Sequence, residues 1–323
     1  KICRPENGLD SALSLAGAAK AALVWGFENP RITLAAAREN VVYRLDADEI
    51  YALRLHRVGY RSAEELRHEL EWIGAMAEAG LPVPRPVALP SGALVTEVEG
   101  QLVSVVTWLG GAPLGAPGEM KNVRDRPAFC RKLGVAMAAL HEACDAWPPA
   151  KGFARPAWDR AGLLGDAPLW GRFWEHPDLN AAERDLLMAA RAQADKALAT
   201  LEGALDYGLI HADLVGQNVM WDGADVGLID FDDGGYGFRI FELATFLLRY
   251  MDAPDYSELR AALCEGYGVR AAIDLQELDL FLMLRAFTYP GWFMDRRDEP
   301  NTAARAARAN ATALKLAQAF MER

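Results

Sequence analysis

The chain has 323 residues, 52% of them hydrophobic and 24% charged, which is typical of a globular protein large enough for one large core or two lobes. Its net charge of −11 argues against nucleic acid or an anionic membrane surface as a partner. Every apolar run of about 18 residues is interrupted, so we expect no membrane span. The four cysteines have neither metal-ligand nor disulfide spacing, and we expect a cytoplasmic protein.

The first third of the chain combines a helix with short β-prone runs. Leu9–Trp25 has the pattern of a packed helix, and Val41–Leu45 and Ile50–His56 are two strands joined by an acidic turn. Leu94–Glu97 and Leu102–Trp108 flank a second turn and predict another hairpin. We expect five strands in this part of the chain.

A capping box that starts at Ser62 predicts a helix running to Ala79. Glu69 falls on the apolar stripe of this helix, and a carboxylate on a buried face needs a partner. In the preceding strand, Arg54 points away from the face that holds Leu53. Arg54 is therefore the partner that we predict for Glu69; the alternatives are a surface arginine on an edge strand and a glutamate at the rim of the stripe.

A composition break at Gly110–Pro113 predicts a hinge, after which apolar residues recur at helical spacing nearly throughout. The segment Ala154–His176 is rich in Trp and Phe, which suits either a core or the wall of a substrate pocket. The helices predicted beyond the hinge are Ala128–Cys144, Asn180–Glu202, Phe241–Met251, Glu258–Tyr267, Leu275–Phe287 and Thr302–Met321.

The most informative stretch is Leu209–Asp230. His211, Asp213 and Asn218 have the spacing H-x-D-x-x-x-x-N, and an Asp-Gly turn between two apolar runs then predicts a hairpin. The hairpin would bring Asn218 and Asp230 side by side as oxygen ligands suited to Mg²⁺, with Asp213 nearby to accept a proton. These are the parts that phosphoryl transfer requires. The alternative is that Asp213 and Asn218 only shape a turn.

This stretch resembles the catalytic loop and metal-binding hairpin of kinases, with IDFD at Ile229–Asp232 standing where protein kinases have DFG. The variant HADLxxxN, followed by IDFDD and FELA, resembles the aminoglycoside phosphotransferase and choline kinase-like family, near homoserine kinase-like proteins and the stress-response kinase SrkA. The resemblance implies an α+β, bilobal protein kinase-like fold. Residues 1–109 would form an N-lobe with a five-stranded antiparallel sheet and a helix, and residues 110–323 a mainly helical C-lobe.

The resemblance also implies roles for the motif residues. Asp213 would orient the acceptor hydroxyl and take its proton, and Asn218 and Asp230 would hold Mg²⁺ against the phosphates of ATP. Arg54, held by Glu69, would clamp these phosphates in place of the lysine that kinases have there.

Residues outside the motif are candidates for cofactor and acceptor binding. Asn40 matches an asparagine that the family places in the segment covering the phosphates. The segment Asp230–Glu242 is short and contains neither Ser nor Thr, so we expect an enzyme that is active without prior phosphorylation and that favours a small acceptor. The acidic and aromatic candidates for a pocket that binds a cationic amine are Asp232, Asp233, Glu242, Tyr236, Tyr289 and Trp292; the alternative is that Glu242 caps a helix and the aromatic residues are core.

We therefore predict an ATP- and Mg²⁺-dependent phosphotransferase that moves the γ-phosphoryl group to a hydroxyl of a small molecule, such as an amino alcohol, amino acid, aminoglycoside or sugar. One alternative is a protein Ser/Thr kinase of the SrkA type, which uses the same chemistry. Another is a nucleotide-binding pseudokinase, which the intact Asp213, Asn218 and Asp230 disfavour. No nucleic-acid or membrane partner is expected. The sequence leaves the acceptor, the adenine contacts and the oligomeric state open.

Overall fold

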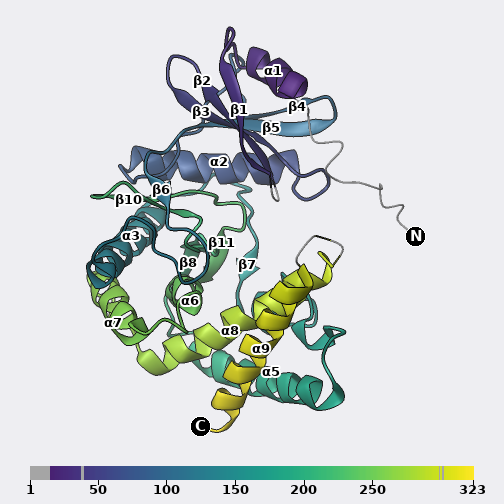
Figure 1. Ribbon diagram of the computed structural model, residues 1–323, viewed down its shortest axis with the longest axis vertical. Coiled ribbons are helices and arrows are strands. Elements are labelled where there is room, and N and C mark those ends of the chain that lie inside the picture. Colours follow the sequence, from purple (N-terminus) through teal and green to yellow (C-terminus); the bar gives the residue numbers. More distant parts are fainter. Residues whose placement is uncertain (1–14, 38–39, 298, 300–301) are drawn as a thin grey trace. The chain divides into compact units, whose positions relative to one another are not determined.

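The computed structural model describes residues 15–37, 40–297, 299 and 302–323 (Figure 1). The chain divides into two compact units. The first, called the N-terminal unit here, comprises Lys1–Gly110 together with Pro149–Ala154 and Gly227–Asp232. The second, called the C-terminal unit, comprises Gly111–Pro148, Arg155–Val226 and Asp233–Arg323.

The N-terminal unit is built on an antiparallel sheet with the strand order β1-β2-β3-β5-β4, which confirms the five predicted strands. The sequence did not locate β1, because nearly all its side chains are exposed and it has no alternating pattern. The elements of this unit are α1 (Leu15–Val24), β1 (Arg31–Ala37), β2 (Val41–Asp46), β3 (Ile50–Leu55), α2 (Ala63–Glu78), β4 (Val95–Val98) and β5 (Gln101–Thr107).

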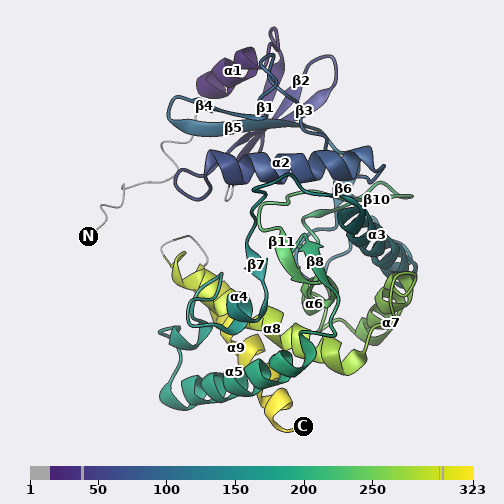
Figure 2. The same ribbon diagram turned by 180° about the vertical axis from the view of Figure 1, so that it is seen from behind.

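The two helices of this unit lie on opposite sides of its sheet (Figures 1 and 2). Leu53 and Leu55 of β3 point into a core that includes Ala18 and Ala22 of α1. The predicted helix Leu9–Trp25 is thus confirmed from Leu15 onward, and its first part lies outside the described residues. Arg54, which alternates with these residues in β3, pairs instead with Glu69 of the other helix, α2.

Helix α2 begins with the predicted capping box. The Ser62 hydroxyl accepts a hydrogen bond from the Glu65 amide at 3.2 Å, and the Glu65 carboxylate accepts one from the Ser62 amide at 2.8 Å. The helix ends just before Gly80, whose φ of +86° is costly for other residues. Both ends of α2 are therefore fixed by local chemistry, which places Glu69 on its buried face.

The C-terminal unit is mainly helical, as predicted. Helix α3 packs against α7, and α8 packs against α6 and α9. Helix α8 continues past the predicted end at Phe287 and through Pro290, which removes one backbone donor without ending the helix. The helical elements are α3 (Arg126–Ala146), α4 (Arg160–Leu164), η1 (Phe173–Glu175), α5 (Ala181–Leu201), α6 (Ile240–Leu248), α7 (Tyr256–Tyr267), α8 (Leu275–Met294) and α9 (Thr302–Met321).

Strands of two small sheets flank the loops that hold the motif residues. One has the order β7-β11-β8 and the other β10-β9-β6, and the pairing of β9 with β10 confirms the predicted hairpin. A Cβ on Gly237 would lie 2.4 Å from the end of the Ile210 side chain in β8 and 2.9 Å from Trp158 Cβ in β7, so β11 packs here with no room for a side chain. The strands are β6 (Ala112–Pro113), β7 (Ala157–Trp158), β8 (Tyr207–Ile210), β9 (Val219–Trp221), β10 (Val226–Leu228) and β11 (Gly235–Phe238).

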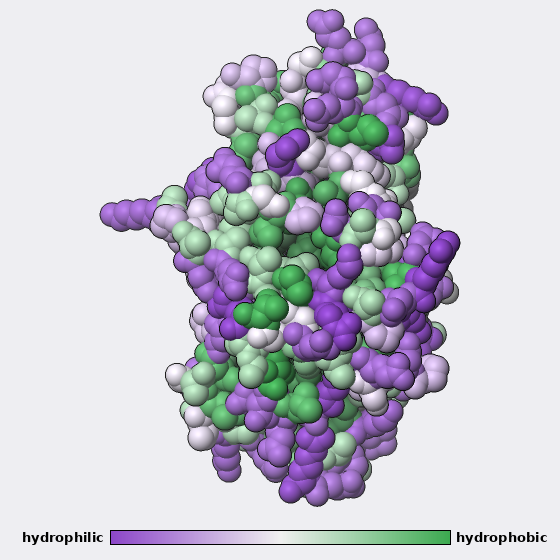
Figure 3. Space-filling model, turned by 90° about the vertical axis from the view of Figure 1, so that its left-hand side faces the viewer, coloured by the Kyte–Doolittle hydropathy of each residue, from purple (hydrophilic) through white to green (hydrophobic). Residues whose placement is uncertain are grey.

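The surface mixes polar and apolar groups. On the face shown in Figure 3, hydrophilic side chains are interspersed with small hydrophobic patches, which is ordinary for a folded protein. The most apolar long helix, α8, has most of its side chains buried within its unit. In the part of the chain that the structure describes, no helix combines the length and the apolar character needed to cross a membrane.

Candidate active site

Strand β8 leads directly into the predicted catalytic loop. His211 is fully buried, and its Nδ1 accepts a hydrogen bond from the Asp213 amide at 3.3 Å. The Asn218 side-chain amide donates to the Asp213 carbonyl at 2.9 Å and to Asp213 Oδ2 at 3.1 Å. With its NH₂ group used in this way, Asn218 keeps its amide oxygen as the atom suited to a cation.

The backbone of the loop is held in an uncommon conformation. Ala212 has a φ of +66°, which costs a residue other than glycine roughly 1–2 kcal/mol. The Glu242 carboxylate in α6 accepts hydrogen bonds from the His211 amide and, at 3.2 Å, from the Ala212 amide. Two hydrogen bonds to one buried carboxyl oxygen offset part of this conformational cost and fix the orientation of the backbone just before Asp213.

Glu242 lies behind the loop rather than in a pocket wall. Its side chain is fully buried and lies 3.9 Å from His141 Nε2, so it does not line a pocket. The N-cap of α6 is Arg239, so Glu242 does not cap this helix either. Burial raises the pKa of Glu242 to about 7, although the two backbone hydrogen bonds and the charges of Arg285 and Arg239 act in the opposite direction.

This shift makes stability depend on pH. The raised pKa means that folded Glu242 keeps a proton between about pH 4.5 and 7 that the unfolded chain has released, so its contribution is complete below this range and is lost as the pH rises through it. Glu242→Gln does not titrate. The parent loses stability over this range and the variant does not. Between pH 5 and pH 8 we therefore expect the unfolding free energy of Glu242→Gln to rise, relative to that of the parent, by up to about 3 kcal/mol.

Urea unfolding of parent and variant at the two pH values measures this difference. Glu258→Gln, which removes an exposed carboxylate from the first turn of α7, is the matched control. A difference between Glu242→Gln and the parent that stays constant over this range would contradict the assignment.

Arg285 of α8 is the main site residue that the sequence reading missed. Its side chain is fully buried, and Nη2 donates to Asp213 Oδ1 at 2.6 Å and to the Tyr289 hydroxyl at 3.0 Å, while Nη1 donates to the Ala212 carbonyl at 3.2 Å. Burial lowers the pKa of Arg285, but Tyr289 and Asp213 outweigh it, so the group stays charged. The available signal was a lone charge within the apolar run Leu280–Phe287.

Aromatic rings surround this guanidinium group. Its central carbon lies 4.5 Å from the Trp170 ring centroid, 4.7 Å from that of Tyr289 and 5.5 Å from that of Phe241. Trp170 belongs to the aromatic-rich segment of the sequence, so part of that segment surrounds a cation of the chain itself. The predicted acceptor residue Trp292 likewise has Arg296 over its ring at 3.9 Å.

The N-terminal unit holds the predicted Arg54–Glu69 pair. Arg54 Nη1 donates to Glu69 Oε1 at 2.8 Å, and both side chains are buried. Burial lowers the pKa of Arg54, but the charges of Glu69, Asp230 and Asp232 together raise it above its usual value. Among the described residues, Arg54 Nη2 has no hydrogen-bond partner, which leaves a buried donor at this position.

The IDFD segment is anchored next to this pair. Asp230 has a φ of +69°, a conformation that Asp tolerates better than most residues. Phe231 packs edge-on against Trp72 of α2 at 5.1 Å. Arg61 donates to the Asp232 carbonyl at 3.0 Å and lies 4.0 Å from its carboxylate. The segment that carries Asp230 is therefore anchored by Trp72 of α2 and by Arg61, just before that helix.

The remaining predicted residues have structural contacts. The Asn40 amide oxygen accepts a hydrogen bond from the Arg57 amide at 3.3 Å. The Trp158 indole donates to the Asp233 carbonyl at 2.9 Å, and Tyr236 sits in β11. Their predicted roles in binding stay predictions, as does the meeting of Asn218 with Asp230.

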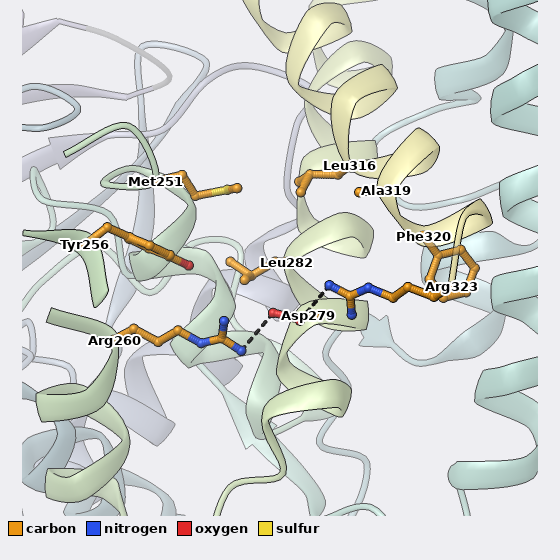
Figure 4. A pocket seen from close by; sticks show the side chains of 9 residues that line it. All are labelled: Met251, Tyr256, Arg260, Asp279, Leu282, Leu316, Ala319, Phe320 and Arg323. Carbon is orange, nitrogen blue, oxygen red and sulfur yellow. Dashed lines mark hydrogen bonds and ion pairs between the residues drawn. The ribbon is translucent and has the colours of Figure 1, made fainter. Parts of the chain in front are cut away.

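A cavity of about 210 Å³ opens among α7, α8 and α9 (Figure 4). Asp279 forms ion pairs there with Arg260 at 2.7 Å and with Arg323 at 2.8 Å, so both arginines that line the cavity are paired. None of the predicted site residues lines this cavity; its lining is Met251, Tyr256, Arg260, Asp279, Leu282, Leu316, Ala319, Phe320 and Arg323.

The five-stranded sheet with its Arg–Glu pair, and the helical unit with its Asp–Asn loop, define an enzyme with the protein kinase-like fold. A comparison with known families identifies the class of enzyme more closely. The sequence model of the phosphotransferase enzyme family matches residues 32–281. The chain belongs to the phosphotransferase enzyme family and is a kinase.

Related sequences come from several bacteria. An uncharacterized protein of Deinococcus radiodurans is 30% identical over 89% of this chain and 85% of its own length. Homoserine kinases of Acidiphilium cryptum and Methylorubrum populi are 33% and 34% identical over 62% and 67% of this chain. The matches span only 60% and 64% of those two homoserine kinases.

Solved structures show the same fold over nearly the whole chain. A microcompartment-associated aminopropanol kinase is similar with a TM-score of 0.82 and 26% identity, covering 96% of this chain and 98% of its own. An amicoumacin kinase, solved with AMP-PNP and Ca²⁺, has a TM-score of 0.75 and 21% identity, covering 94% of this chain and 93% of its own.

Proposed function

We propose that the protein transfers the γ-phosphoryl group of ATP to a hydroxyl of a small molecule, with amino alcohols and hydroxy amino acids as the first candidates. The observation that carries this proposal is Asp213, whose carboxylate is fixed by Asn218 and Arg285 yet is partly exposed. The similarity to an aminopropanol kinase and to homoserine kinases supports the acceptor class.

Asp213 orients the acceptor hydroxyl and accepts its proton as the new bond to the γ-phosphorus forms. The bond from that phosphorus to the bridging oxygen breaks, and ADP leaves with the electron pair. Since the transition state of phosphoryl transfer is loose, the position of the hydroxyl matters more than the strength of the base. A carboxylate held by two side chains suits this task.

Arg54 binds phosphate oxygens of the nucleotide. Its Nη1 is committed to Glu69, and Nη2 is the buried donor that a phosphate oxygen would satisfy. Glu69 keeps the guanidinium plane in one orientation, so the second nitrogen is presented in a fixed direction. Asn40 is proposed to contact the nucleotide from the segment before β2.

The residues fit a divalent cation. The Asn218 amide oxygen and the Asp230 carboxylate are hard ligands, the kind that Mg²⁺ prefers. Within the described residues no three His, Cys, Asp or Glu side chains gather in a metal-binding group, so phosphate oxygens and water would supply the other ligands, as is common for Mg²⁺. Bound Mg²⁺ would neutralise charge on the phosphate oxygens.

An acceptor screen tests the proposal. The protein is incubated with Mg²⁺-ATP and single amino alcohols, hydroxy amino acids, sugars or aminoglycosides, and ADP release is measured against a reaction without acceptor. We expect release that saturates with at least one amino alcohol or hydroxy amino acid. Efficient phosphorylation of a protein substrate, together with no acceptor-dependent release for any small molecule, would contradict the proposal.

Arg54→Ala should weaken ATP binding by about 10- to 100-fold, which is the cost of losing one charged hydrogen bond. Arg54→Lys should recover part of the affinity, because the charge returns without the planar fork. Calorimetric titration with AMP-PNP and Mg²⁺ gives the affinities. Arg44→Ala, on the neighbouring strand and half-exposed, is the control. Parent-like binding by both Arg54 variants would remove Arg54 from the nucleotide site.

A further inference from the structure

We propose that Arg285 is a positioning residue for Asp213, which it acts through without touching the acceptor. This inference rests on the proposed function of Asp213. It assigns a catalytic purpose to a buried arginine and to the aromatic rings around it.

Arg285 and Asp213 differ in their exposure to solvent. The Arg285 side chain is 0% exposed and that of Asp213 is 24% exposed, so an acceptor can reach the carboxylate but not the guanidinium group. Arg285 therefore influences the reaction only through the groups that it holds.

The hydrogen bonds leave a defined place for the acceptor. Arg285 occupies Oδ1 of Asp213, and Asn218 donates to Oδ2. Each carboxylate oxygen accepts up to two hydrogen bonds, so one lone pair remains on each, and the acceptor hydroxyl can meet the carboxylate only in the directions that Arg285 and Asn218 leave free. Without Arg285, the carboxylate can rotate about its side-chain bonds, and either oxygen can meet the hydroxyl in several directions.

The guanidinium group is itself fixed on several sides. Nη1 donates to the Ala212 carbonyl. The rings of Trp170, Phe241 and Tyr289 lie within 5.5 Å of the guanidinium carbon. Since Glu242 holds the Ala212 amide and Arg285 holds its carbonyl, both peptide groups that flank this left-handed residue are bound by buried side chains. The position of Asp213 is thus set by its backbone and by its carboxylate together.

Three variants test the proposal: Arg285→Met, Arg285→Lys and Arg249→Met. Arg249 also lies over the Tyr289 ring, at 5.2 Å, and is the matched control for loss of a cation from the aromatic cluster. We expect Arg285→Met to lower kcat about 100-fold, the effect of misplacing a catalytic group, with KM for ATP unchanged. Arg285→Lys should recover part of kcat, and Arg249→Met should stay within about threefold of the parent.

The double variant with Asp213→Asn separates positioning from folding. If Arg285 acts through Asp213, adding Arg285→Met to Asp213→Asn lowers kcat no further, because the group being positioned is already lost. Additive losses, or a parent-like kcat in Arg285→Met, would overturn the inference. Should Arg285→Met fail to fold, the same comparison is made with Arg285→Lys.

Failure of the proposed function looks different. In that case Asp213→Asn alone keeps the parent kcat. An inactive Asp213→Asn beside a fully active Arg285→Met refutes only the role of Arg285.

Discussion

Asp213→Asn should lower kcat by about three orders of magnitude while ATP binding stays close to that of the parent. The amide has nearly the shape of the carboxylate but cannot take the acceptor proton. It also breaks the hydrogen-bond pattern, because an NH₂ group now faces one of the two donors from Asn218 and Arg285. The nucleotide does not depend on this side chain, so its affinity is preserved.

Initial rates with the best acceptor from the screen give kcat, and titration with AMP-PNP gives the nucleotide affinity. Asp225→Asn, on the exposed turn of the hairpin, is the matched control and should behave like the parent. A kcat within tenfold of the parent would remove Asp213 from the proposed role. A parallel loss of nucleotide affinity would mean that the variant disturbs more than the acceptor.

Asp230→Asn should abolish the Mg²⁺-dependent part of ATP binding. The amide keeps the size of the side chain and tolerates the φ of +69°, whereas Asp230→Ala would add backbone strain to the lost charge. A neutral ligand holds Mg²⁺ far less well than a carboxylate, and the unneutralised phosphates then bind poorly. We expect turnover to fall by at least two orders of magnitude, with the nucleotide-induced rise in melting temperature lost.

Thermal unfolding with and without Mg²⁺-ATP measures this effect. For the parent, ATP at about 100 times its Kd should stabilise the fold by roughly 2.7 kcal/mol. The melting temperature without nucleotide shows whether the variant itself is folded. Asp225→Asn again serves as the control. A full ATP-induced shift in Asp230→Asn would contradict its assignment as a metal ligand.

Local sequence patterns predicted the parts of the fold that local chemistry decides. The capping box at Ser62, the hairpin between β9 and β10, and the alternation that turns Arg54 toward Glu69 are all confirmed. In each case the residues involved lie close in sequence, or a buried charge narrowed the choice of partner. The extent of α8 was underestimated because Pro290 is tolerated within it.

The missed features depend on long-range packing. Arg285 lies 72 positions from Asp213 in the sequence. Their pairing depends on how α8 packs, which the local sequence pattern does not reveal. Glu242 was visible as an acidic residue near the motif, but its burial behind the loop follows only from the packing of α6. Strands β8 and β11 are short, and the glycines of β11 hide its pattern.

Phosphorus NMR of a reaction containing the protein, Mg²⁺-ATP and the acceptor selected by the screen, without prior phosphorylation of the protein, follows the proposed transfer itself. We expect a phosphate monoester of the acceptor to grow at the same rate as ADP, and to be absent with Asp213→Asn. Inorganic phosphate as the only product of ATP, phosphate found only on the protein, or no consumption of nucleotide would each rule out the proposed transfer to a small molecule.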